Sequence, residues 1–451
     1  MVEDQDIICA LATPNGVGAI GLIRLSGKDS WELVSGNFSK QLKEQASHTV
    51  HFGTISDKEG KAIDEVLVTL FKKGKSFTGE ESAEISCHGS LFIQQKIITT
   101  LTEAGCRLAH PGEYTQRAFL NGRMDLSQAE AVADLIASES RSAHNVALKQ
   151  LRGGFSSELK EVREKLINFA SLIELELDFA EEDVEFADRT ELKKMVSEVL
   201  VYIRRLAQSF ELGNAIKNGV PVAIVGAPNT GKSTLLNQLL GDDRAIVSNI
   251  EGTTRDVIEE TLNIDGILFR LIDTAGIRED AKEIEAMGIE RSRAKIEQAT
   301  IVLCLADVAK QNSVEEGKKW VKELSKTHPE KKIVLLVNKM DIAKNGEASA
   351  THISAKTGAG IAELKQELVV LIRGDFDPSN ETIVSNSRHH EALVHTAEML
   401  QKAEQGLNTG VTADFVAMDI RQAMFHLGGI TGDISTDDLL GNIFSKFCIG
   451  K

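Results

Sequence analysis

Residues 226–233 have the types and the spacing of a loop that binds phosphate. They read Gly-Ala-Pro-Asn-Thr-Gly-Lys-Ser, which is the pattern G-x-x-x-x-G-K-[ST]. In such a loop, backbone N–H groups converge on phosphate oxygens at the N-terminus of a helix. Lys232 would then reach the β- and γ-phosphates, and the hydroxyl of Ser233 would bind Mg²⁺. ATPases share this pattern, so the loop alone does not identify the base.

Three further motifs follow in order and indicate guanine. They are Asp273-Thr-Ala-Gly276, Asn338-Lys-Met-Asp341 and Ser354-Ala-Lys356. Asp341 can accept two hydrogen bonds, from N1–H and from the 2-amino group of guanine. Adenine offers neither donor and would leave the carboxylate unpaired, which is how a polar site rejects an analogue. The four motifs together predict that the nucleotide is GTP.

The segment 248–256 reads Ser-Asn-Ile-Glu-Gly-Thr-Thr-Arg-Asp and lies where small GTPases have the loop that closes over the nucleotide. Thr254 would supply a second hydroxyl to Mg²⁺ while the γ-phosphate is present; the alternative is a plain surface loop. The predicted GTP-binding residues are Gly226, Asn229, Thr230, Gly231, Lys232, Ser233, Thr234, Ser248, Asn249, Ile250, Glu251, Gly252, Thr253, Thr254, Asp273, Thr274, Ala275, Gly276, Asn338, Lys339, Asp341, Ser354, Ala355 and Lys356.

One position departs from the usual catalytic pattern. After Asp-Thr-Ala-Gly, Ras-like enzymes place a Gln that orients the attacking water. This chain has Ile277 there, which has no hydrogen-bonding group. Either hydrolysis is very slow, or another group positions the water. The residues themselves do not choose among the polar candidates downstream, which are Arg278, Glu279, Asp280, Glu283 and Glu285.

Short apolar runs precede the motifs and would position them. Pro221–Val225, Ile267–Ile272 and Ile333–Val337 each read as a buried strand that delivers a motif at its end. Leu235, Leu236, Leu239 and Leu240 continue after the phosphate loop as the face of a helix.

Composition limits the class of protein. A chain of 451 residues should form roughly two to four domains. No apolar run approaches the ~20 residues that span a bilayer, and the acidic N-terminus does not resemble a signal peptide. The five cysteines are odd in number and lack a C-x-x-C pair, which favours reduced thiols. We therefore expect a cytoplasmic protein without membrane contact. The net charge of −16 argues against broad, non-specific binding of nucleic acid.

The pattern of the chain changes at three places. Residues 1–120 read as an α+β domain, 121–217 as the first part of a helical domain, 218–373 as the GTPase domain and 374–451 as the second helical part. The predicted fold is thus an α/β P-loop GTPase domain inserted into an α-helical domain and preceded by an α+β domain. Two separate helical bundles are the alternative.

Outside the GTPase motifs, the chain resembles the MnmE (TrmE) family of tRNA modification GTPases. The resemblance rests on the following segments: Arg24-Leu-Ser-Gly27, Thr78-Gly-Glu80, Cys87-His-Gly89, His110-Pro-Gly-Glu113, Arg117-Ala-Phe-Leu-Asn121 and Phe447-Cys-Ile-Gly-Lys451. It implies that the N-terminal domain binds tetrahydrofolate. It further implies a homodimer and a heterotetramer-type complex with MnmG, which uses FAD and NADH. Such proteins place an aminomethyl or carboxymethylaminomethyl group on C5 of the wobble uridine of tRNA.

The resemblance also implies a folate site. Its donor would be 5,10-methylene- or 5-formyl-tetrahydrofolate, held by Arg24, Glu80, Arg123 and Lys451. A pterin offers N–H donors that suit Glu80, and a glutamate tail suits the cations. From the residues alone, Arg24 and Arg123 would be surface cations. Cys448 is a redox or nucleophilic thiol near the one-carbon donor in one interpretation, and a structural cysteine in the other.

Finally, the resemblance implies that K⁺ bridges two GTPase domains. Its ligands would be Asn229, Ser248, Ile250 and Thr253, and Glu285 would orient the water that Ile277 cannot. K⁺ would supply the positive charge that an arginine finger supplies elsewhere. The alternative for Glu285 is a solvated carboxylate. Two rival functions remain: an Era-like regulatory GTPase of ribosome assembly without one-carbon chemistry, and an N-terminal domain that serves only dimerisation.

Overall fold

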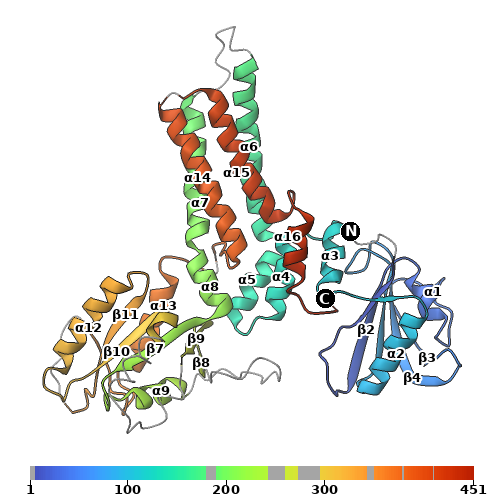
Figure 1. Ribbon diagram of the computed structural model, residues 1–451, viewed down its shortest axis with the longest axis horizontal. Coiled ribbons are helices and arrows are strands. Elements are labelled where there is room, and N and C mark those ends of the chain that lie inside the picture. Colours follow the sequence, from blue (N-terminus) through green and yellow to red (C-terminus); the bar gives the residue numbers. More distant parts are fainter. Residues whose placement is uncertain are drawn as a thin grey trace. The chain divides into compact units, whose positions relative to one another are not determined.

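The structure is a computed structural model of the chain, and it describes residues 6–178, 189–241, 260–272, 295–342, 350–377, 380–409 and 411–450. The chain divides into two compact units. The first unit contains residues 1–136, 148–196 and 398–451, and the second contains residues 137–147 and 197–397. Figure 1 shows the elements of both units.

The N-terminal part of the first unit is a six-stranded sheet in the order β3-β4-β5-β2-β1-β6. All neighbouring strands are antiparallel except β1 and β6, which are parallel. The strands are β1 (Ile8–Leu11), β2 (Ile20–Ser26), β3 (Thr49–Ser56), β4 (Ala62–Phe71), β5 (Ser82–His88) and β6 (Arg107–Leu108).

One face of this sheet is covered by α1 (Ser30–Ser35) and α2 (Leu91–Glu103). Their buried side chains pack on the alternate, inward-facing residues of the strands in a single apolar core. The opposite face of the β3–β4–β5–β2 part carries the row of partners Phe52, Leu67, Ser86 and Leu22. Near β1, Tyr114 lies on that opposite face, at the start of α3 (Glu113–Leu120). The hydroxyl of Tyr114 donates to the Arg24 carbonyl at 2.7 Å.

The helical part of the first unit brings together segments from both sides of the GTPase motifs. Helix α6 (Gly154–Asp178) packs along α15 (Ala413–Thr431), and Arg163 pairs with Asp433 at 2.7 Å. The two halves therefore form one helical body, and the alternative of two separate bundles is wrong. The other helices are α4 (Leu126–Ile136), α16 (Asp437–Phe444) and three that contain residues of both units, α5 (Arg141–Leu151), α7 (Arg189–Gln208) and α14 (Ser387–Thr409).

The last residues of the chain return to the N-terminal sheet. The backbone N–H of Gly112 donates to the carbonyl of Cys448 at 3.4 Å. Gly450 has φ 90°, and a Cβ there would collide with the Leu11 carbonyl oxygen. Only glycine fits this position, so the terminal segment can lie directly against the end of β1.

The second unit is built on a six-stranded sheet in the order β12-β11-β10-β7-β9-β8, in which only β8 is antiparallel to its neighbour. The strands are β7 (Val220–Gly226), β8 (Glu260–Ile264), β9 (Ile267–Leu271), β10 (Ile301–Asp307), β11 (Lys332–Asn338) and β12 (Thr351–His352). The helices around them are α8 (Phe210–Asn218), α9 (Lys232–Leu240), α12 (Ser313–Thr327) and α13 (Ile361–Arg373).

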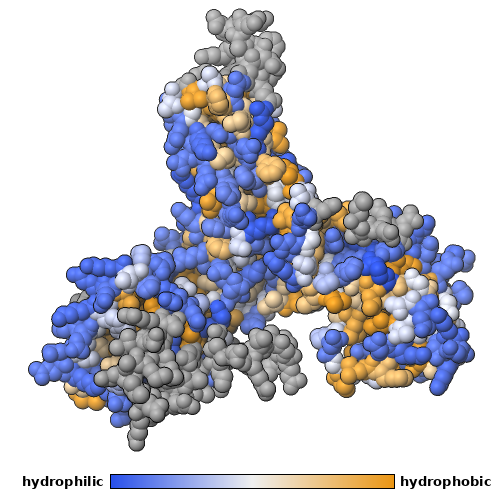
Figure 2. All heavy atoms as spheres, in the orientation of Figure 1, coloured by the Kyte–Doolittle hydropathy of each residue, from blue (hydrophilic) through white to orange (hydrophobic). Residues whose placement is uncertain are grey.

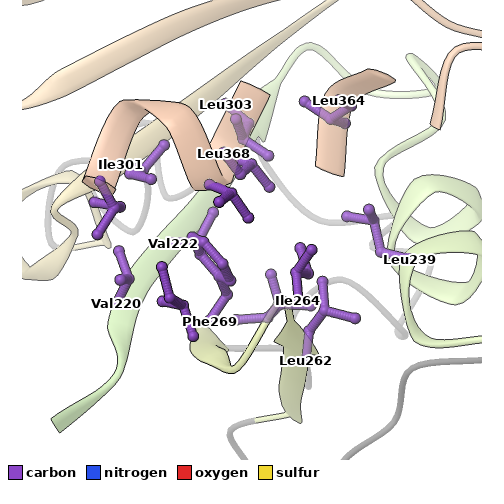
Figure 3. Close-up of a cluster of buried hydrophobic side chains, with 14 of the residues drawn as sticks. Val220, Val222, Leu239, Leu262, Ile264, Phe269, Ile301, Leu303, Leu364 and Leu368 are labelled. Carbon is purple, nitrogen blue, oxygen red and sulfur yellow. The ribbon is translucent and has the colours of Figure 1, made fainter. Parts of the chain in front are cut away.

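Apolar side chains cover both faces of this sheet. Figure 3 shows Val222, Phe269 and Leu303 of the strands facing Leu239 of α9 and Leu368 of α13. A second cluster, with Leu324 of α12, lies on the other face. Strand β10 is buried along its whole length, as is usual for a parallel strand between two helical layers. The predicted fold, an α/β P-loop GTPase domain inserted into an α-helical domain and preceded by an α+β domain, is confirmed.

The strands that were expected from apolar runs are present as β7, β9 and β11 within a residue or two. Within the described ranges, none of the helices is both long and apolar enough to cross a membrane.

Candidate functional site

The phosphate loop joins the carboxyl end of β7 to the N-terminus of α9. Gly231 has φ 101°, and a Cβ there would collide with the side-chain amide of Asn338, so the two motifs fit together only with glycine at this position. Asn229 also has a positive φ, 61°. Ser233 and Thr234 follow Lys232 in the first turn of α9, where a helix N-terminus favours an anionic ligand.

Lys232 lies back over the loop that precedes it. Its ammonium donates to the carbonyls of Gly226 and Ala227, both at 3.0 Å. Burial lowers the pKa of Lys232, and the charges of Lys295 and Lys310 lower it further. A polyphosphate bound to the loop would supply the opposite charge that this lysine needs in its half-buried position.

Asn338 ties two loops of the site to each other. Its amide nitrogen donates to the carbonyl of Thr230 at 2.8 Å, and its amide oxygen accepts from the N–H of Ala355 at 2.9 Å. The side chain is buried, and both bonds are directed by the planar amide. Asn338 therefore holds the phosphate loop and the Ser354–Lys356 loop in a fixed relation.

Lys339 makes a second link to the phosphate loop. Its ammonium donates to the Asn229 carbonyl at 3.1 Å and pairs with the buried Asp307 at 2.6 Å. Asp307 ends β10 and also accepts from the N–H of Ala309. Sequence reasoning missed Asp307. The signal that could have found it is a carboxylate at the carboxyl end of a wholly apolar run.

Asp341 is held for the base that it is expected to read. The Ser354 hydroxyl donates to one of its oxygens at 2.7 Å. This hydrogen bond, followed by the charges of Lys356 and Lys339, keeps the pKa of Asp341 below its usual value. The carboxylate therefore stays ionised at neutral pH, as a hydrogen-bond acceptor for guanine must.

The remaining predicted residues of the nucleotide site lie outside the described residues. They are Ser248, Asn249, Ile250, Glu251, Gly252, Thr253, Thr254, Asp273, Thr274, Ala275, Gly276 and Glu285. The second Mg²⁺ hydroxyl, three of the four K⁺ ligands and the water-orienting glutamate therefore stay predictions.

In the first unit, three of the four predicted folate residues gather around the segment 77–80. The guanidinium of Arg24 lies 5.7 Å from the ring centroids of both Phe77 and Tyr114 and pairs with Glu84 at 2.8 Å. Glu80 accepts from the Ser26 hydroxyl at 2.7 Å. The side chain of Arg123 packs against Gly79, so closely that a Cβ added there would be in tight contact with it. Its guanidinium donates to the Gly74 carbonyl at 3.3 Å.

Cys448 is exposed, in the terminal segment that lies against β1 and the start of α3. Lys451 lies outside the described residues. Sequence reasoning missed the groups that support the folate residues, namely Ser26, Phe77, Glu84 and Arg117. Arg117 stands in a motif that supported the resemblance, and the Glu113 four residues before it was the available signal of a helical ion pair.

Comparison with known proteins identifies the family. The family model described as the MnmE helical domain matches residues 126–448, and the one described as the N-terminus of the GTP-binding protein TrmE matches residues 7–123. The chain belongs to the MnmE family. The tRNA modification GTPase MnmE of Cytophaga hutchinsonii is 54% identical over 462 residues, which cover 100% of this chain and 99% of that protein. The MnmE of Flavobacterium johnsoniae is 50% identical over 99% of this chain and 100% of that protein.

The predicted family is thus confirmed, and with it the predicted enzyme class, a GTP hydrolase that acts in tRNA modification. Among solved structures, the G domain of the T. maritima FeoB iron transporter is similar over 33% of this chain and 96% of that chain, with 26% identity and a TM-score of 0.25.

We predict that Asp341→Asn changes the base preference of this MnmE-family chain. The amide cannot accept from both donors of guanine, so GTP should bind about 100-fold more weakly or worse, because two charge-assisted hydrogen bonds are lost at ~1.5–3 kcal/mol each. Xanthosine triphosphate, which has a carbonyl in place of the 2-amino group, should bind better than to the wild type. Titration calorimetry with both nucleotides measures this. Asp375→Asn, an exposed position in the same unit, is the control. Equal losses for both nucleotides would contradict the assignment.

Proposed function

We propose that this chain is a K⁺-dependent GTPase that dimerises and, with an FAD-dependent partner, modifies C5 of the wobble uridine of tRNA. The one-carbon donor is a tetrahydrofolate derivative bound by the N-terminal domain. The observation that supports the proposal is that one MnmE-family chain holds both Asp341, oriented by Ser354, and a cluster of Arg24, Glu80 and Arg123 around one segment.

The nucleotide part of the proposal rests on the arrangement of charge. Lys232 and the N-terminus of α9 suit the phosphates, and Asp341 suits the guanine edge. Ser233 and Thr254 would hold Mg²⁺. K⁺ would lie beside the phosphates with Asn229, Ser248, Ile250 and Thr253, and hydrolysis would use Glu285 to orient water.

The folate part rests on complementary chemistry. A pterin presents adjacent N–H donors, which a carboxylate such as Glu80 can accept, and the ring can lie beside the aromatic side chains near Arg24. Arg123 and Lys451 suit the carboxylates of the glutamate tail. Cys448, whose thiol is exposed, would be available to the one-carbon unit.

The homodimer is supported by the open face of the N-terminal sheet. Phe52 and Leu67 are paired across β3 and β4, and they are 56% and 45% exposed; Val50 and Ile20 are exposed on neighbouring positions of the same face. Figure 2 shows hydrophobic surface on this domain near the place of β2 in Figure 1. Clustered apolar side chains on an uncovered sheet face fit burial against a second copy.

Mass analysis of wobble nucleosides tests the function as a whole. Transfer RNA from cells that lack the gene should lose the aminomethyl-type modification at C5, and the wild-type gene should restore it. A gene that encodes Lys232→Ala serves as the control for nucleotide dependence and should not restore it. Unchanged wobble nucleosides together with a defect in ribosome assembly would instead favour the Era-like switch.

The rate of GTP hydrolysis should depend on the alkali ion. We expect the rate in KCl to exceed that in NaCl of equal ionic strength by at least about tenfold, because K⁺ would stabilise charge that develops on the phosphates. GTP affinity measured in the two salts is the control, and it should change much less than the rate. Equal rates of hydrolysis would remove K⁺ from the mechanism.

A charge on the open sheet face should separate the dimer. Leu67→Asp buries a carboxylate against the second copy, so the molecular mass by light scattering should fall toward that of a monomer at micromolar concentration. Val201→Asp is the matched control, because Val201 is an exposed apolar residue of α7 outside this face, and it should leave the mass unchanged. If Leu67→Asp stays dimeric with an intact circular dichroism spectrum, the dimer uses another surface.

A further inference from the structure

Five ionised side chains meet behind the predicted folate residue Glu80. They are two arginines and three carboxylates: Arg107, Arg117, Asp6, Glu80 and Glu113. Arg117 and Glu113 are almost completely enclosed, with side chains 5% and 2% exposed, whereas Glu80 is 24% exposed. Asp6 and Arg107, with side chains 27% and 37% exposed, also reach the surface. The cluster therefore has an enclosed centre, Arg117 and Glu113, and Glu80 is one of its three accessible members.

The two arginines contact the same two acids, but only Arg117 also contacts Glu80. Arg107 pairs with Asp6 and with Glu113, both at 2.7 Å. Arg117 pairs with the same two acids, at 2.5 and 2.9 Å, and its Nη1 also donates to both oxygens of Glu80 at 3.3 Å. Among the ion pairs of the described residues, Glu80 is reached by Arg117 alone.

The cluster contains three carboxylates and only two guanidinium groups. Burial opposes ionisation of Asp6 and Glu113, but the hydrogen bonds from the arginines outweigh it and lower the pKa of both acids. Asp6 and Glu113 thus stay ionised and each contacts two arginines. Glu80 has only the longer bonds from Arg117 and the hydroxyl of Ser26 at 2.7 Å. Glu80 is therefore the least fully paired of the three carboxylates.

We infer that Arg117 is a positioning residue for ligand recognition by Glu80, an inference that rests on the proposed folate site. Arg117 is fixed by Asp6 and Glu113, and together with Ser26 it fixes both oxygens of Glu80. The carboxylate is then pre-oriented toward a ligand that offers two adjacent N–H donors, which is the chemistry of a pterin edge. Pre-orientation matters because a carboxylate that must first be immobilised binds more weakly.

The test is a double-mutant cycle on the full chain, with binding of 5-formyltetrahydrofolate measured by titration calorimetry. We expect Arg117→Met to weaken binding about 10- to 100-fold, the range for loss of a hydrogen bond to a charged group. Glu80→Gln should weaken it at least as much. The double variant should bind no more weakly than Glu80→Gln alone, because Arg117 acts through Glu80.

Arg107→Met is the matched control. It removes bonds to the same two acids and leaves the contacts of Glu80 in place, so it should lower the denaturation midpoint while folate affinity stays within about twofold of the wild type. Should Arg117→Met fail to fold, Arg117→Lys replaces it in the cycle. It keeps the charge but cannot span Asp6 and Glu80, so weaker binding is again expected.

The outcomes separate the inference from the proposed function. If the wild type binds folate and Glu80→Gln does not, but the folded Arg117 variant binds like the wild type, the inference is overturned and the folate site stands. Additive losses in the double variant, or an equal loss in Arg107→Met, would overturn it too, because the cluster would then act only on stability. If the wild type itself does not bind the folate, the proposed one-carbon function fails, and the inference fails with it.

Discussion

The nucleotide site depends on one buried amide. Asn338 uses its donor for the phosphate loop, at the Thr230 carbonyl, and its acceptor for the N–H of Ala355. Because an amide group is planar, the two bonds fix the distance and the angle between these loops at once. The phosphate loop and the loops that are expected to bind guanine therefore cannot be positioned independently. Asp341, held by Ser354 on the same loop as Ala355, inherits this geometry.

In the proposed folate site, charged side chains hold the carboxylate in position, whereas an amide positions the loops of the nucleotide site. A carboxylate that must accept from a ligand cannot be enclosed and fully paired, since it would then have no capacity left. The buried Arg117 is held by Asp6 and Glu113 and contacts Glu80 only through bonds of 3.3 Å. Glu80 therefore keeps capacity to accept further hydrogen bonds. In both proposed sites the carboxylate that would bind the ligand, Asp341 or Glu80, accepts a hydrogen bond from a neighbouring hydroxyl, Ser354 or Ser26.

The sequence predicted several elements that a local run of residues forms, and it missed contacts between residues that are far apart in the chain. Apolar runs gave β7, β9 and β11, because strands buried on both faces are continuously hydrophobic. Strand β3 was not predicted, because Val50 and Phe52 are exposed on one face while Gly53 and Ile55 are buried on the other, so its apolar residues do not mark a single buried face. The pairing of Arg117 with Glu113 could have been predicted from their four-residue spacing, but its contact with Glu80, 37 residues away, could not. Asp307 was also missed, although it ends the apolar run of β10; only its pairing with Lys339 depends on the alignment of β10 with β11.

The two candidate sites belong to different compact units, which limits how one can influence the other. The chain passes between the units four times, after residues 136, 147, 196 and 397, and the last three of these positions lie within α5, α7 and α14. A helix transmits rotation and translation along its axis with little loss, because each turn is bonded to the next. A change in the second unit on nucleotide binding would therefore reach the first unit through the backbone of α5, α7 and α14. If the proposed one-carbon chemistry is coupled to GTP hydrolysis, a flexible residue such as glycine inside these helices should weaken that coupling.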